Sequence, residues 1–238
     1  MNSSPPGWGD DELTRFFEIC RENQLATFHN KIESKRAIQI DQLFEKIFSK
    51  WINPRPSLPV LFFVRAVSAF RASSQLVFSG QIPEAFALLR LCLEWSGYAS
   101  LIASDPKLFE VWISREDNKK AKRVFRDTFK FGAMRESIRK RDIVDARVFE
   151  ELIERTIGFG AHPMPISTFN LIEIEGLDNG DTSINSMQII GDGATLDYSL
   201  KTLSQVGICT HYIFMGIYRA RYELLGVRYD LIELRKGL

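Results

Sequence analysis

Residues 83–103 read PEAFALLRLCLEWSGYASLIA, an apolar stretch about as long as a membrane-spanning helix. Arg90 and Glu94 lie in its middle, where a charge is costly in hydrocarbon. On a helical wheel, apolar side chains cover most of the circumference and leave one narrow polar stripe. The stretch therefore predicts a helix in the core of a soluble protein, with no membrane span.

The segment before this helix has the same character. Residues 58–70 are apolar around Arg65, and helical periodicity continues to residue 79. Ser57 is placed to cap a helix over 58–79, and Gly80 is placed to end it. The connection to the next helix is short, which predicts two antiparallel neighbours.

The N-terminal part predicts two more helices. Apolar side chains recur at helical spacing over residues 11–52, with Asp10 or Asp11 as the cap. A single helix of that length would span roughly 60 Å at about 1.5 Å per residue. We therefore expect a break near residues 23–30, where the apolar stripe blurs.

Residues beyond 104 predict further helices of a more polar kind. Asp105 followed by a proline is a helix start, and the segment after it carries Phe125 and Phe129 on one face. Another helix runs through Val144, Val148, Leu152 and Ile157 and ends at Gly158 and Gly160.

Residues 166–200 change character. The alternation over 169–175 is typical of a strand. The run Met187–Ile190, then Gly191-Asp192-Gly193, then Thr195–Tyr198 is typical of two strands joined by a hairpin turn. From about Ser199 a long helix resumes, and Gly226 breaks it.

Taken together, these patterns predict a mainly α fold. We expect a helical bundle with a small antiparallel β-hairpin insertion near residues 166–200. We expect residues 1–9 to form a disordered arm and residues 10–238 to form a single helical domain that includes the β element.

Composition narrows the classes of function. The net charge is +1, so no global field attracts nucleic acid or an anionic membrane. Cys20, Cys92 and Cys209 lie far apart in apolar surroundings, which predicts reduced thiols in the cytoplasm and no disulfide. The N-terminus lacks the features of a signal peptide. No cluster has metal-ligand spacing, so we predict no metal and no cofactor.

Arg90 and Glu94 are the first candidate site. They share the polar stripe of helix 83–103 with Gly97, and Tyr98 lies at its edge. Arg and Glu four residues apart can pair. One interpretation is a polar ligand-binding site in the bundle, formed by Arg90, Glu94 and Tyr98. The other is a solvent-facing stripe or a structural ion pair.

Arg155 and His162 are the second candidate site. Arg, four to six residues and then His resembles the signature of the HEPN superfamily, helical bundles that include metal-independent RNases of toxin and antiphage systems. Residues 60–238 also resemble uncharacterised bacterial helical-bundle proteins. The resemblance implies Arg155 and His162 as a catalytic pair in a site shared across a dimer. The alternative is a tight turn in which His162 binds the backbone.

Residues 115–142 are the third candidate. They carry 11 Lys or Arg and 5 Asp or Glu, a net charge of +6, with aromatic residues between them. Such a pattern is typical of a phosphate-contacting surface for RNA and also of an ordinary solvated helix face. The nucleic-acid interpretation assigns the contacts to Lys119, Lys120, Lys122, Arg123 and Arg126.

Two functions follow from these candidates. The first is a non-enzymatic helical protein that binds a partner or small ligand, as a homodimer. The second is a HEPN-like RNase that uses Arg155 and His162, with RNA bound along the basic face. The sequence leaves open whether the protein is an enzyme.

Overall fold

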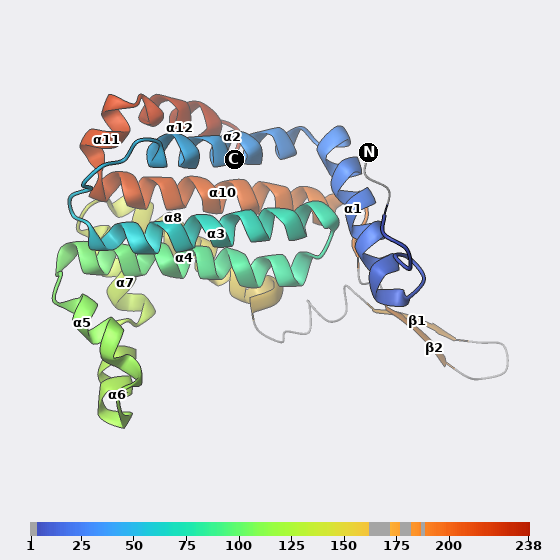
Figure 1. Cartoon of the computed structure of the whole chain (residues 1–238), viewed down its shortest axis with the longest axis horizontal. Helices are drawn as coiled ribbons and strands as arrows, with labels where there is room; N and C mark the ends of the chain where they lie inside the picture. Colours follow the sequence, from blue (N-terminus) through green and yellow to red (C-terminus); the bar gives the residue numbers. More distant parts are fainter. Residues whose placement is uncertain (1–3, 162–171, 177–181, 187–188) are drawn as a thin grey trace.

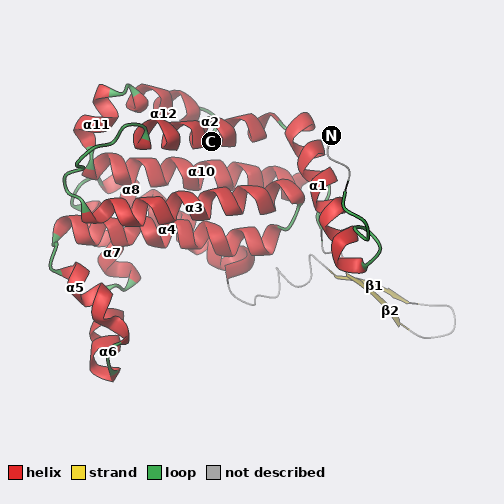
Figure 2. Ribbon diagram, viewed as in Figure 1, coloured by secondary structure: helices red, strands yellow, loops and turns green. Residues whose placement is uncertain are grey.

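The computed structural model describes residues 4–161, 172–176, 182–186 and 189–238. Helices dominate this part of the chain, and two short strands are the β structure in it (Figure 2). The prediction of a mainly α bundle is confirmed.

The elements follow one another with short connections. The first half of the chain contains α1 (Glu12–Asn30), α2 (Ile32–Phe48), α3 (Leu58–Ser79), α4 (Ile82–Ser104), α5 (Leu108–Ile113) and the turn η1 (Ser114–Glu116). The second half contains α6 (Lys119–Thr128), α7 (Phe131–Arg139), α8 (Ile143–Thr156), the π-helical turn η2 (Ile157–Ala161), β1 (Ile172–Gly176), β2 (Thr182–Ser186), α10 (Ala194–Ile217), α11 (Arg219–Leu224) and α12 (Val227–Arg235).

Helices α3 and α4 form an antiparallel pair on the near side of the bundle, with α7 and α8 behind them (Figure 1). Gly80 joins the two in the left-handed conformation, with φ of 84°. Its carbonyl accepts a hydrogen bond from Ile190 N at 2.9 Å, and a Cβ at Gly80 would lie 2.2 Å from Ile190 O. The position therefore requires glycine for its conformation and for the close approach.

The predicted break in the N-terminal segment falls at Lys31, one residue beyond the expected range. Asp11 caps α1, because its carboxylate accepts hydrogen bonds from Leu13 N and Thr14 N. Lys31 is only 14% exposed and forms ion pairs with Asp192 and Asp197. The break thus ties the α1–α2 junction to the start of α10.

Helix α10 lies at the centre of the bundle and packs on α2, α3, α4, α8 and α12. Its Gly207 permits close packing, because a Cβ there would lie 2.6 Å from Phe70 and 2.7 Å from Ile40. Large aromatic side chains fill the core around it. The fully buried ones are Phe44, Phe62, Phe63, Phe70, Phe86, Phe149, Phe214 and Tyr222.

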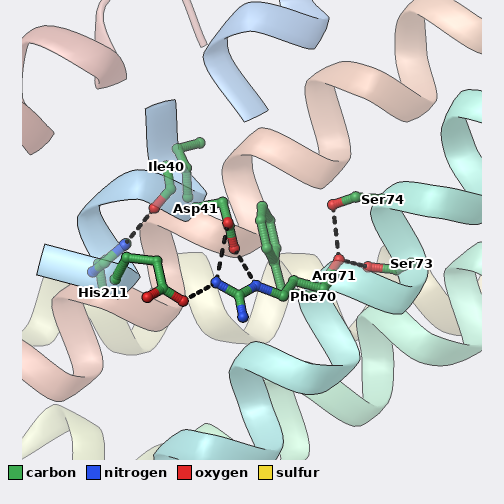
Figure 3. Close-up of polar contacts among 8 residues, drawn as sticks. Ile40, Asp41, Phe70, Arg71, Ser73, Ser74 and His211 are labelled. Carbon is green, nitrogen blue, oxygen red and sulfur yellow. Dashed lines mark hydrogen bonds and ion pairs between the residues drawn. The ribbon is translucent and has the colours of Figure 1, made fainter. Parts of the chain in front are cut away.

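His211 on α10 is fully buried and stacks on Phe44, with ring centroids 3.8 Å apart. Its Nε2 lies 3.2 Å from Ile40 O (Figure 3), and its Nδ1 lies 3.1 Å from the Tyr222 hydroxyl. The neutral ring with hydrogen on Nε2 satisfies both contacts, since Nε2–H donates to Ile40 and Nδ1 accepts from Tyr222. His211 therefore joins α2, α10 and α11 as a structural residue.

An ion pair on the bundle surface joins α2 and α3 beside this core. Arg71 donates from Nε to Asp41 Oδ1 at 2.7 Å and also pairs with Glu45 (Figure 3). All three side chains are about a third exposed or more, so solvent screens the pair and its contribution to stability is small.

The predicted hairpin lies in the expected region but not at the expected residues. Strands β1 and β2 pair antiparallel, with Ile174 opposite Ile184. The prediction that Thr195–Tyr198 form a strand after a Gly191–Gly193 turn is wrong, because α10 begins at Ala194. Leu196 and Leu200 lie one turn apart and are buried in the core, so this stretch buries an apolar helical face as the first turns of α10.

Three smaller predictions also differ from the structure. Ser57 lies just before α3 with helical backbone angles, and its side chain forms no capping hydrogen bond. Asp105 starts a turn, and α5 itself begins at Leu108. The last long helix starts earlier than Ser199 and ends at Ile217, where Tyr218 interrupts it.

Two helices of the described part, α3 and α4, are long and apolar enough to cross a membrane by length and composition. In each, a large share of the apolar window is buried within the fold, 44% for α3 and 61% for α4. All three cysteines are free and buried.

The buried His211 makes a pH-dependent contribution to stability. Burial lowers its pKa from 6.5 to about 3, so the unfolded chain binds a proton first as the pH falls. The free energy of unfolding should fall by about 1.4 kcal/mol per pH unit below about pH 6.5 through this group.

The measurement is urea unfolding of wild type and His211→Gln at several pH values between 7 and 4. An amide can fill both hydrogen-bond roles without titrating, so the difference between the two proteins should shrink as the pH falls. His29→Gln, at an exposed histidine, is the control and should leave the wild-type slope unchanged. A constant difference between wild type and His211→Gln would contradict the assignment. Comparing the two proteins cancels the opposite contribution of Asp145, whose pKa burial raises to about 6.

Candidate ligand-binding site

Arg90, Glu94 and Tyr98 occupy successive turns on one side of α4 and line the same pocket, of about 420 Å³. Arg90 Nε donates to Glu94 Oε1 at 2.8 Å. The two side chains are 26% and 30% exposed, so the pair is shielded from most solvent without being buried. The structure thus brings together the three residues that the sequence predicted as one site.

The walls of the pocket come from elements far along the chain. Phe129 follows α6, Phe131 and Met134 belong to α7, and Ile153 and Ile157 come from α8 and η2. Their side chains are apolar, so the pocket is a mostly apolar hollow with charged groups along one side. The charged residues are Arg90, Glu94 and, from α8, Glu154.

Gly97 lets this wall approach α4. A Cβ at Gly97 would lie 2.6 Å from Met134 Sδ, closer than side chains pack. Gly97 therefore leaves the space in the polar stripe that the Met134 side chain fills. An alanine there would push the thioether out of its place beside the pocket.

Tyr98 joins the pocket to an aromatic cluster. Its ring packs edge-on against Phe129, with centroids 5.0 Å apart, and against Phe125 at 6.2 Å. Burial raises the pKa of its hydroxyl, and the negative charge of Glu94 raises it further. No hydrogen bond from this hydroxyl to another described residue is present. The phenol is therefore neutral at physiological pH and can bind a ligand.

The sequence order of the two charged residues, Arg90 before Glu94, is the one that stabilises a helix less. A Glu that precedes its basic partner by four residues favours a helix more than the reverse order does. Here the Arg comes first. The pair therefore gives little to the helix itself and presents a cation and a carboxylate side by side at the pocket.

The lining side chains are suited to binding. Besides the apolar walls they are Arg90, Glu94, Glu154 and Tyr98, which can form ion pairs and hydrogen bonds with a ligand. Apolar walls with a few charged and hydroxyl groups are typical of sites that hold a small molecule.

Arg155 does not belong to this pocket. Its guanidinium donates to Gln205 Oε1, lies 3.5 Å from Thr202 Oγ1, and stacks over Tyr198 at 5.5 Å. It lines a separate cavity of about 200 Å³ between α8, α10 and α12. His162 lies outside the described residues, so the Arg155–His162 pair stays a prediction.

The five basic residues predicted for nucleic acid all lie on α6, which projects from the bundle (Figure 1). Each is exposed; Lys122, Arg123 and Arg126 have side chains 72%, 78% and 77% exposed. The opposite face packs inward through Phe125, which stacks on Phe129 with ring centroids 5.0 Å apart. This arrangement fits both interpretations of the basic stretch.

Asp145 is a residue that the sequence analysis did not single out. It lines the Arg155 cavity and also a neighbouring cavity of about 190 Å³ that contains Arg141. Burial raises its pKa to about 6, and the nearby Asp142 adds to the shift. Its position three residues after the helix cap Asp142 is that of an ordinary first-turn acid, so no sequence signal distinguished it.

No group of three or more His, Cys, Asp or Glu in the described residues could hold a metal ion. Comparison with protein families, curated proteins and solved structures finds no match to the chain.

Because the Arg90–Glu94 pair is half-buried, we expect a measurable interaction free energy between the two side chains. A double-mutant cycle with alanine at both positions should give about 1 kcal/mol of interaction free energy in urea unfolding. The Arg147–Glu151 pair on α8 is the matched control, because it has the same spacing but side chains 73% and 60% exposed. Its coupling should stay below about 0.5 kcal/mol. Additive effects of Arg90→Ala and Glu94→Ala would contradict the coupling.

Proposed function

We propose that the protein is a non-enzymatic helical protein that binds a small molecule in the pocket between α4, α7 and α8. The observation that carries the proposal is that Arg90, Glu94 and Tyr98 line one pocket with apolar walls. Its volume of about 420 Å³ lies within the range of roughly 300–1,000 Å³ that is usual for ligand sites.

The lining chemistry defines the class of ligand. The walls fit an apolar or aromatic body against Phe129, Phe131 and Met134. Glu94 and Glu154 fit hydrogen-bond donors or a cationic group, and the Tyr98 hydroxyl can donate or accept. The ligand is therefore an amphipathic small molecule, with its polar end against α4 and its apolar body against α7.

The test is a thermal-shift screen with small molecules that carry an aromatic or alicyclic body and an amine or hydroxyl group. A compound present at about 100 times its Kd should raise the melting temperature by about 5–10 °C. The double variant Arg90→Ala/Glu94→Ala should lose most of this shift. The matched double variant Arg147→Ala/Glu151→Ala should keep it.

Two outcomes would count against the site. Hits that stabilise the Arg90→Ala/Glu94→Ala variant as well as wild type would place the ligand elsewhere. If the Arg147→Ala/Glu151→Ala variant also lost the rise in melting temperature, the loss would be a general effect of removing surface charge.

The RNase function stays an alternative that no observation in the described residues favours. The non-enzymatic proposal predicts that wild type, His162→Ala and the control His29→Ala show the same background cleavage of single-stranded RNA in EDTA. Cleavage by wild type and His29→Ala that His162→Ala lacks would replace the proposal with the RNase. Charge reversal at Lys119, Lys120, Lys122 and Arg123 would then weaken RNA binding and its salt dependence.

A further inference from the structure

The outward side of α4 carries a stripe of four side chains at spacings of four, three and four residues. These are Glu84, Leu88, Leu91 and Trp95. Glu84 is exposed, and the other three are only partly buried in the described fold. On the neighbouring α3, Leu61 and Val64 are 55% and 48% exposed. The α3–α4 pair thus presents an apolar outer face that the described residues leave partly open.

The spacing of this stripe is the same in both directions. About a point midway between Leu88 and Leu91, Glu84 exchanges with Trp95 and Leu88 exchanges with Leu91. Alternating steps of three and four residues are the spacing of a helix–helix seam. A two-fold axis through that point would pair two antiparallel copies of α4, with Leu88 against Leu91 at the centre and Glu84 against Trp95 at each end.

The charges at the two ends are complementary under the same axis. The Arg65 guanidinium on α3 lies 5.7 Å from the centre of the Trp95 ring. Neither Arg65 nor Glu84 forms an ion pair with another described residue. The antiparallel pairing places Glu84 of one copy opposite Trp95 of the other, and therefore beside Arg65 of the other. Each dimer would hold two such pairs.

The residues of α3 near the same two-fold axis are also compatible with a dimer. Arg65 and Trp95 lie side by side on antiparallel helices, so the axis at the middle of the α4 stripe crosses α3 near residue 70. The exposed Ser68 and the half-buried Ala72 lie on either side of that point, and the exposed Arg71 beside them is paired with Asp41 and Glu45 on α2. Small residues at the axis allow two α3 helices to approach closely.

We propose that the protein forms a two-fold symmetric homodimer through the outer faces of α3 and α4, with Leu88 and Leu91 at the centre and Glu84–Arg65 pairs at both ends. The four helices of the interface form two antiparallel layers. Four charged side chains lie at or beside this interface: Arg65, Glu84, Arg90 and Glu94. Because charges are costly in lipid hydrocarbon, we expect a protein partner on this face.

The test is sedimentation velocity over a range of micromolar concentrations. Wild type should sediment as a dimer. Leu91→Glu and Glu84→Arg should each raise the dimer Kd by at least about tenfold, because a symmetric dimer contains each substitution twice. Glu84→Arg also places two positive charges together, since its new side chain faces Arg65 of the other copy. Glu84→Arg combined with Arg65→Glu should return the Kd to within about threefold of wild type. Tyr229→Glu on α12, at a side chain 74% exposed, is the control and should leave the Kd unchanged.

Melting temperatures within a few degrees of wild type show that the variants are folded. Monomeric wild type would overturn the proposal, and so would a dimer that Leu91→Glu and Glu84→Arg do not weaken. Failure of the charge exchange to restore the dimer would overturn the register. A monomer that sediments with vesicles of phosphatidylcholine and phosphatidylglycerol would assign the same face to lipid.

Discussion

The structure depends on how α10 is fixed against α2 by a neutral histidine in the core. His211 stacks on Phe44 and contacts the Ile40 carbonyl and the Tyr222 hydroxyl, so one ring joins three helices. Burial in this apolar core favours the uncharged ring, which lowers the pKa of His211 to about 3. Gly207, one turn before it, allows Ile40 and Phe70 to approach the same helix.

This arrangement determines where a site can form. With α10 central, one side of α4 packs on it through buried residues such as Leu89, Cys92 and Leu93. The remaining surface of α4 carries the Arg90–Glu94 pair toward α7 and α8, and the Glu84–Trp95 stripe outward. One helix therefore provides the core contact, the pocket and the proposed dimer face. The pocket and the dimer face adjoin each other but use different side chains.

Local signals in the sequence predicted the ends of single helices and the residues that share one side of a helix. Gly80 and the proline at 83 fix the ends of α3 and α4, so these bounds agree with the structure within a residue. Arg90, Glu94 and Tyr98 could be grouped because their spacing on one helix is enough to place them together. Phe86 is fully buried, whereas Trp95 lies at one end of the outward stripe and is only partly buried.

Features that depend on distant contacts could not be predicted in this way. The pocket walls at Phe129, Met134 and Ile157 come from segments whose packing on α4 no periodicity reveals. Gly191-Asp192-Gly193 has the local chemistry of a hairpin turn, but the residues after it form the start of α10, where Leu196 and Leu200 are buried in the core at helical spacing. Local propensity and tertiary contact disagreed there, and the contact decided the structure.

The most direct measurement of the central claim is methyl NMR of methionine-labelled protein during titration with a compound from the screen. Met134 lines the proposed pocket, and Met215 lines a cavity between α7, α8 and α10. Binding as proposed should shift the Met134 methyl signal progressively and leave that of Met215 in place. Gly97→Ala, which displaces Met134, should alter the titration. A shift of Met215 alone, or of neither methyl at saturating compound, would contradict the assignment of this pocket as the functional site.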